Sequence, residues 1–218
     1  MQNFSAIVLG ATGATGKELL ISLLNDSDYN SVVVFSRETP KERHKKLKTH
    51  LIDFSKIESY KELIQGDILF SCLGTTLNAA GSKDKQFQVD YTYQYKFAKL
   101  ASENGVKTYS LVSSVGAKSN SPFFYLKMKG QLEESIKKLK FEIIQIFQPP
   151  SLIRQEELLR AGEKITIRIL KGLNSIGFMK SQKPLSVSVL AKKMIIEAKK
   201  HQVIKVKTFK NQEIFNLM

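Results

Sequence analysis

The sequence predicts an α/β fold built on a doubly wound parallel sheet, and three observations support this prediction. Short runs of β-branched residues alternate with longer amphipathic runs along the chain. No internal repeat, low-complexity tract or Pro/Gly/Ser-rich linker interrupts them. The first apolar run leads directly into three spaced glycines and then a helical pattern. Such alternation is typical of βαβ units, whose ligands bind outside the carboxyl ends of the strands.

The first half of the chain supplies four of the expected strands. Residues 5–9 form a short apolar run, and residues 17–25 carry leucines at positions 19, 20, 23 and 24 on one helical stripe. Further short runs predict strands, and an amphipathic stretch lies between the last two. The expected strands are 5–9, 32–35, 49–53 and 67–73, and the expected helices are 17–25 and 55–64.

The second half continues the same alternation. Gly105 is a natural residue just beyond a helix end, and Pro149-Pro150 stops a strand because proline cannot donate to a central ladder. The run at 203–209 is expected to be an edge strand. The expected strands are 107–113, 141–147 and 203–209, and the expected helices are 86–104, 125–139, 158–174 and 187–200.

Length and composition fit one globular domain. The 218 residues are 42% hydrophobic and 25% charged, so we expect a single domain over 1–218 with 151–218 as a small substrate-side extension. No run approaches the roughly 18 to 20 apolar residues of a membrane span, and the start lacks a basic targeting region. One cysteine and three scattered histidines predict no disulfide and no metal centre. A soluble protein of the reducing cytoplasm, without a membrane partner, is the expectation.

The net charge of +14 would attract phosphates, nucleic acid or acidic membranes. Only 5 of the 34 basic residues are arginine, whereas proteins that read bases rely on the arginine fork. Residues 192–210 are rich in lysine but offer Phe209 as their single aromatic for stacking. We therefore expect solvated lysine faces and no nucleic-acid partner, with a phosphate-bearing small molecule as the next explanation.

The motif GATGATG joins the first strand to the first helix. A glycine triplet in this context allows a tight turn, close phosphate approach and close helix packing, while backbone N–H groups and the helix dipole hold a pyrophosphate. The motif therefore predicts dinucleotide binding. The expected binding residues are Gly10, Thr12, Gly13, Ala14, Thr15 and Gly16.

The end of the second strand, Phe35-Ser36-Arg37, should lie beside the adenosine ribose. An acid there hydrogen-bonds a free 2′-hydroxyl, whereas a base accommodates a 2′-phosphate. Arg37 therefore favours NADP(H) over NAD(H), and Glu38, one residue further, is the argument for the other cofactor.

A serine, tyrosine and lysine constellation follows the fifth strand. Ser114 directly follows that strand, and Tyr125 and Lys129 share one face of the next helix. A neighbouring ammonium favours the phenolate of a tyrosine, which otherwise has a pKa near 10, so the pair suits proton relay. Ser113 is the alternative to Ser114, because two adjacent serines cannot be assigned from sequence. Tyr95 and Lys99 have the same spacing but no preceding serine pair, and are interpreted as helix surface.

The motifs GATGATG, SCLGTT, LVSSVGA and YLKMKG occur in an order and spacing that resemble the short-chain dehydrogenase/reductase superfamily. The sequence is most similar to its atypical branch, which includes the HIV Tat-interacting oxidoreductase-like family and its bacterial relatives. The resemblance runs from the first strand to about Ala198. It implies a Rossmann fold, NADPH as preferred cofactor, and a Ser-Tyr-Lys site at Ser114, Tyr125 and Lys129 with Tyr125 as proton donor.

The resemblance also implies further cofactor contacts after the fourth and sixth strands. In the family, residues after the sixth strand lie against the nicotinamide and commonly read Arg-Pro-Gly, whereas this chain reads Gln148-Pro149-Pro150 before Ser151 and Leu152. Asp90 corresponds to a family Val-Asp or Val-Asn position, for which helix packing is the simpler interpretation. The implied contacts are Cys72, Leu73, Gly74, Thr75 and Leu152.

Three functions follow as hypotheses. The first is an NADPH-dependent oxidoreductase that transfers hydride to or from a small carbonyl or alcohol substrate. The second is a non-catalytic NADPH-binding sensor or regulatory protein with a protein partner. The third, an epimerase-like enzyme, is weaker because about 68 residues after the sixth strand leave little material for a larger substrate lobe.

Overall fold

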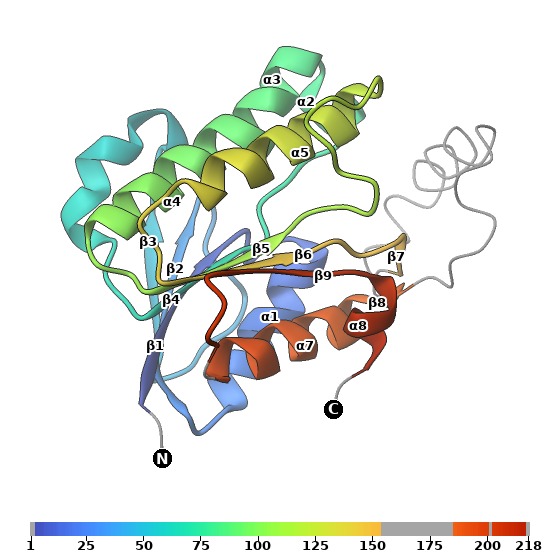
Figure 1. Ribbon diagram of the computed structural model, residues 1–218. Coiled ribbons are helices and arrows are strands. Elements are labelled where there is room, and N and C mark those ends of the chain that lie inside the picture. The colour runs from blue at the N-terminus through green and yellow to red at the C-terminus, as the bar shows by residue number, and fades with distance from the viewer. Residues whose placement is uncertain (1–2, 154–184, 201, 217–218) are drawn as a thin grey trace.

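The computed structural model describes residues 3–153, 185–200 and 202–216. Its main sheet has seven parallel strands in the order β3-β2-β1-β4-β5-β6-β9, and Figure 1 shows helices on both faces. The doubly wound Rossmann architecture predicted from sequence is confirmed. The strands are β1 (Phe4–Leu9), β2 (Tyr29–Ser36), β3 (Leu47–Leu51), β4 (Ile68–Ser71), β5 (Thr108–Val112), β6 (Ile143–Phe147) and β9 (Val206–Phe209).

The helices divide between the two faces of the sheet. In Figure 1, α1, α7 and α8 lie on one side, and α4 and α5 lie on the other. A two-stranded parallel pair, β7 (Leu152–Ile153) with β8 (Leu185–Ser186), stands apart from the main sheet. The helical segments are α1 (Ala14–Asn25), η1 (Phe54–Leu63), α2 (Leu77–Ala80), α3 (Lys83–Phe87), η2 (Gln88–Tyr93), α4 (Gln94–Glu103), α5 (Phe124–Lys137), α7 (Val187–Lys199) and α8 (Asn211–Phe215).

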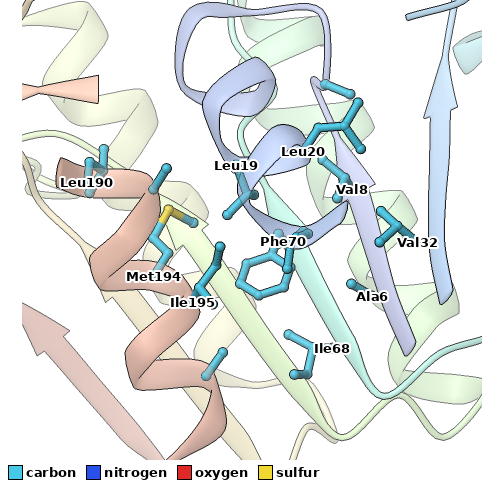
Figure 2. Close-up of a cluster of buried hydrophobic side chains, with 14 of the residues drawn as sticks. Ala6, Val8, Leu19, Leu20, Val32, Ile68, Phe70, Leu190, Met194 and Ile195 are labelled. Carbon is cyan, nitrogen blue, oxygen red and sulfur yellow. The ribbon is translucent and has the colours of Figure 1, made fainter. Parts of the chain in front are cut away.

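One hydrophobic core lies between the sheet and helices α1 and α7. Figure 2 shows Leu19 of α1 and Met194 of α7 directed toward the ring of Phe70 on β4. Ala6 and Val8 of β1 join this cluster, because alternate strand residues face the same side. Burying each large apolar side chain here contributes roughly 1.5–3 kcal/mol.

A second core fills the opposite face of the sheet. Ile7 and Leu9, the alternate residues of β1, pack in it with Phe97 of α4 and with Leu132 and Ile136 of α5. Both faces of β1 are therefore buried, which explains its continuous apolar run. The two cores hold α1 and α5 against the carboxyl ends of the central strands, where the predicted site residues lie.

Several expected elements differ from the structure in extent. The helix expected over 86–104 is three joined segments, α3, the π-helical η2 and α4, and the helix expected over 55–64 is the 3-10 segment η1 with non-helical backbone at Lys56. The strand expected over 49–53 runs from Leu47 to Leu51.

Two short helices were not expected. Helix α2 buries none of its residues, so it leaves no apolar periodicity, and α8 buries Ile214 alone. The late edge strand is confirmed as β9, which pairs with β6. The helix expected over 158–174 lies outside the described residues.

The strand order reverses beside β1, which has β2 on one side and β4 on the other. In an open parallel sheet, the crevice at such a switch point is the usual ligand site. The turns that leave β1 and β4 both emerge there, at their carboxyl ends.

Candidate functional site

The glycine turn joins β1 to α1 at this switch point. Gly10 has φ +80°, and its carbonyl accepts a hydrogen bond from the N–H of Gly13 at 3.0 Å. Helix α1 begins at Ala14 with no acidic residue in its first turn. The free N–H groups and the positive dipole end of this helix can therefore hold a phosphate.

Gly10 and Gly16 lie so close to other backbone atoms that neither position has room for a side chain. A Cβ on Gly16 would lie 2.0 Å from the carbonyl oxygen of Gly10, and one on Gly10 would lie 2.6 Å from the carbonyl carbon of Cys72. The turn is therefore packed tightly against both its own helix and the end of β4.

We expect Gly16→Ala to weaken NADPH binding roughly 10- to 100-fold, because accommodating the new methyl costs about 1–3 kcal/mol of distortion within the phosphate-binding turn. NADPH fluorescence titration measures this. Gly105→Ala is the control for backbone strain outside the turn, since its φ of +83° makes alanine unfavourable although no atom crowds the Cβ position. Equal nucleotide affinity in wild type and Gly16→Ala would show that the turn does not bind phosphate.

The end of β2 presents both charges considered for the ribose. Ser36 is buried, and its hydroxyl donates to the backbone carbonyl of Glu38, which turns the chain away from the sheet. Arg37 and Glu38 are both exposed at this turn. The position suits a nucleotide ribose, and the choice between its 2′-hydroxyl and 2′-phosphate stays a prediction.

The segment after β4 lies next to the glycine turn. Cys72 donates its N–H to the carbonyl of Leu9 at 2.9 Å. Burial raises the pKa of the Cys72 thiol to about 12, and the nearby charge of Lys129 offsets this only in part. The thiol therefore stays protonated at neutral pH, which argues against a nucleophilic cysteine.

Asp90 connects this segment to the lysine of the predicted constellation. Its Oδ2 accepts the N–H of Thr75 at 2.8 Å, and its Oδ1 lies 3.4 Å from Nζ of Lys129. The side chains of Asp90 and Lys129 are 1% and 4% exposed, so this ion pair is buried. A Cβ on Gly74 would lie 3.2 Å from Oδ1 of Asp90, so the exposed Gly74 also leaves room for the carboxylate.

The backbone around Asp90, in the π-helical segment η2, is held by side-chain hydrogen bonds. The backbone carbonyl of Asp90 accepts a hydrogen bond from the side-chain amide of Gln94 at 2.8 Å, and the amide oxygen of Gln94 accepts one from the hydroxyl of Ser71 at 2.7 Å. Sequence reasoning assigned Asp90 to helix packing and missed this ion pair. The available signal was the family Val-Asp position that Asp90 occupies, because no local pattern marks it as the buried residue of η2.

Burial and mutual attraction shift the pKa values of both Asp90 and Lys129. Burial raises the pKa of Asp90, against the lowering effect of Lys129 and the Thr75 N–H. Burial also lowers the pKa of Lys129, but Tyr125 and Asp90 together outweigh it, so the net pKa is raised. Lys129 is therefore a permanent ammonium at neutral pH.

Tyr125 lies at the start of α5, one turn before Lys129, and is 38% exposed. Desolvation raises the pKa of its phenol, Asp90 adds to this, and Lys129 lowers it. The ammonium acts in the direction expected from sequence, but the net shift is upward. The resting phenol is therefore protonated and able to donate a proton.

The two adjacent serines have different surroundings. Ser113 is buried, and its hydroxyl donates a short hydrogen bond to Glu133 of α5. Ser114 is half-buried, with its hydroxyl directed to the carbonyl of Val115 at 3.3 Å. Gln148 donates to both carboxylate oxygens of Glu133, at 3.0 and 3.1 Å. Sequence reasoning did not identify Glu133.

The remaining expectations concern positions at the margins of the site. Leu152 is half-buried and begins β7, and its contact with a nicotinamide stays a prediction. Lys99 is 56% exposed on the surface of α4, and its Nζ lies 4.0 Å from Oε1 of Glu103.

Across the described ranges, no group of three His, Cys, Asp or Glu side chains could hold a metal ion. In the same parts of the chain, no helix is long and apolar enough to cross a membrane.

Comparisons with known proteins agree with this geometry. A family model described as NAD(P)H-binding matches residues 10–156. A short chain dehydrogenase family protein from Francisella tularensis superposes with a TM-score of 0.70 at 17% identity, over 98% of each chain, which shows the fold. The fold and the glycine turn thus define an NAD(P)H-binding protein of the Rossmann type.

The chain belongs to the NAD(P)H-binding family that this model describes. It is 38% identical over 167 residues to Protein HTATIP2 of Rattus norvegicus, which covers 75% of this chain and 69% of that protein. It is 33% identical over 202 residues to "Protein FMP52, mitochondrial" of Candida albicans, which covers 90% and 88%. The predicted resemblance is confirmed.

Proposed function

We propose that this protein is an NADPH-dependent oxidoreductase acting on a small carbonyl or alcohol substrate, with Tyr125, Lys129 and Ser114 as its catalytic residues. One observation carries the proposal. A protonated phenol and a buried, permanently charged ammonium share one helix face, and the ammonium is paired with Asp90, which binds the N–H of Thr75 in the segment after β4. A protein that only binds nucleotide has no use for this pair.

A bound nicotinamide would supply hydride to the substrate carbon. Tyr125 donates its phenolic proton to the carbonyl oxygen as that oxygen becomes negative, and the phenolate left behind is stabilised by the Lys129 ammonium. Ser114 donates a hydrogen bond that positions the same oxygen. Tyr125 then recovers a proton from solvent, to which it is partly exposed. Alcohol oxidation reverses these steps.

The residues around the switch point fit a dinucleotide in chemical terms. The start of α1 would hold the pyrophosphate of a bound dinucleotide, and Arg37 would bind its 2′-phosphate. The residues that would hold the pyrophosphate are Gly10, Thr12, Gly13, Ala14, Thr15 and Gly16, and the further cofactor contacts would be Cys72, Leu73, Gly74, Thr75 and Leu152. In this proposal, residues 1–218 form a single domain, with 151–218 as a small substrate-side extension.

A non-catalytic NADPH sensor is the second candidate, and the charges around Tyr125 are the observation in its favour. Asp90 already neutralises Lys129, and the pKa of Tyr125 is raised rather than lowered. NADPH-dependent turnover of any carbonyl substrate excludes this candidate.

The cellular compartment is proposed from the cysteine content of the chain. The single cysteine suits a reducing compartment such as the cytoplasm. The name of the Candida albicans relative assigns that relative to mitochondria. Imaging of the tagged full chain in its native cell distinguishes the two.

The cofactor proposal predicts selective binding. We expect Arg37→Ala to weaken NADPH roughly 10- to 100-fold and leave NADH affinity unchanged, because a charge-assisted hydrogen bond to the 2′-phosphate contributes about 1.5–3 kcal/mol. Calorimetric titration with both nucleotides measures this. Arg43→Ala is the matched control, since Arg43 donates to the backbone carbonyls of Pro40 and Glu42 in the same loop. An equal loss for NADPH and NADH would refute the assignment of Arg37.

A further inference from the structure

A buried carboxyl group lies beside the proposed catalytic residues without taking part in their chemistry. Glu133 is 5% exposed and lies on α5, one turn beyond Lys129. Its Oε1 accepts the hydroxyl of Ser113, and both its oxygens accept the side-chain amide of Gln148. Burying a carboxyl group is unfavourable unless it is hydrogen-bonded, so this position calls for an explanation.

The three residues come from three different elements. Ser113 follows β5, Gln148 follows β6, and Glu133 comes from the helix that packs over both strands. Backbone hydrogen bonds continue the contact between the strand ends, from Ser113 N–H to the carbonyl of Phe147 at 2.7 Å and from Val115 N–H to that of Pro149 at 3.0 Å. Glu133 therefore ties α5 to the carboxyl ends of β5 and β6.

No lysine or arginine in the described ranges forms an ion pair with Glu133, and Lys129 is paired with Asp90 instead. The charged groups that act on Glu133 are Lys129, Lys137 and Glu134, all on its own helix. Ser113 and Gln148, from the two strand ends, are neutral donors. Burial raises the pKa of Glu133, and the hydrogen bonds from Ser113 and Gln148 lower it in part.

These contacts separate the two serines. Along an extended chain, adjacent side chains point to opposite sides, and the Ser113 hydroxyl is directed to the buried Glu133. The Ser114 hydroxyl has only a long contact, at 3.3 Å, to the carbonyl of its own neighbour Val115. A substrate oxygen can replace that contact without breaking a buried hydrogen bond.

We propose that Glu133 is a positioning residue that commits the hydroxyl of Ser113 to the protein interior, and so makes Ser114 the serine that meets the substrate. This inference rests on the proposed oxidoreductase function. In this proposal Gln148 holds the Glu133 carboxylate in the orientation that receives Ser113.

Turnover of carbonyl substrates is the first test. We expect Ser114→Ala to lower kcat/KM roughly 10²-fold or more, as loss of one donor to a developing oxyanion does. Ser113→Ala and Glu133→Gln should lower it less than about tenfold, and Glu133→Leu, which removes the acceptor, should lower it further than Glu133→Gln. Glu134→Gln is the matched control, because Glu134 is the exposed neighbour on α5. If Ser113→Ala loses turnover while Ser114→Ala retains it, the inference is overturned.

Thermal unfolding as a function of pH is the second test, and it needs no substrate. Because the folded-state pKa of Glu133 is raised, the folded protein binds more protons above the ordinary pKa of the carboxyl group, and its stability falls as pH rises. Glu133→Gln removes this contribution, so the decrease in Tm from pH 5 to pH 8 becomes smaller than in wild type. Ser113→Ala removes a hydrogen bond that lowers the pKa, so the decrease becomes larger.

The two tests separate failure of this inference from failure of the proposed function. Ser114→Ala and Glu134→Gln should keep nearly the wild-type pH dependence of Tm, with Asp90 contributing equally to all variants. If wild type binds NADPH but turns over no carbonyl, the proposed function fails, and the Tm profiles still decide whether Ser113 and Glu133 act together. Identical profiles in wild type, Ser113→Ala and Glu133→Gln would overturn the inference in either case.

Discussion

Tyr125→Phe is expected to lower kcat/KM for carbonyl reduction roughly 10²- to 10⁴-fold, the usual contribution of a positioned acid. Phenylalanine keeps the ring and removes only the proton donor. The affinity for NADPH should stay within about twofold, because Tyr125 belongs to α5 and supplies no group to the phosphate-binding turn before α1. Steady-state kinetics with a carbonyl screen and fluorescence titration of NADPH measure the two quantities.

Tyr95→Phe is the matched control for this variant. Tyr95 has a lysine four residues later, as Tyr125 does, but its half-buried ring stacks on Tyr91 with centroids 6.0 Å apart and packs against the second core. Turnover in Tyr95→Phe should equal that of wild type. If Tyr125→Phe retains turnover within threefold, proton donation by Tyr125 is excluded.

The raised pKa of Tyr125 also fixes the pH dependence of the two reaction directions. Reduction requires the protonated phenol, so its rate should be flat through neutral pH and fall only above the ordinary tyrosine pKa of about 10. Oxidation requires the phenolate, so its rate should rise steadily with pH over the same range. The two directions therefore have opposite pH profiles from a single group.

The features predicted from sequence are those whose residues are close along the chain. The glycine turn is one contiguous motif between a strand and a helix, and Tyr125 and Lys129 share a face because a helix repeats nearly every four residues. The alternation of apolar runs likewise predicts the doubly wound sheet, since parallel strands buried on both faces show continuous apolar sequence. Local geometry is enough for each of these inferences.

The features missed are contacts between distant elements. The Asp90–Lys129 pair joins η2 to α5, and the cluster of Ser113, Glu133 and Gln148 joins two strand ends to a helix. Register between elements determines such contacts, and no local pattern encodes it. The π-helical segment was missed for a similar reason, since its residues have an ordinary amphipathic sequence and the extra residue per turn shows only in the backbone.

Asp90→Leu is expected to destabilise the fold by about 3–5 kcal/mol, the cost of leaving a buried charge without its partner. The ammonium of Lys129 is 4% exposed, and Asp90 is its only ion-pair partner among the described residues. Asp90→Asn should cost less, because the amide oxygen can still accept the N–H of Thr75 and face Lys129. Urea unfolding at pH 7 measures the free energies.

The double variant Asp90→Leu/Lys129→Met decides whether the ion pair itself stabilises the site. Replacing both charges by apolar side chains removes the desolvation cost along with the attraction, so the double variant should be more stable than Asp90→Leu alone. Its turnover should nevertheless be abolished, since the Lys129 ammonium is proposed to stabilise the phenolate of Tyr125. If the double variant is as stable as wild type but has no turnover, the buried ion pair serves catalysis and does not serve folding. If Asp90→Leu costs less than about 1 kcal/mol, Lys129 is not held by Asp90 in solution, and the permanent ammonium beside Tyr125 must be explained by another group.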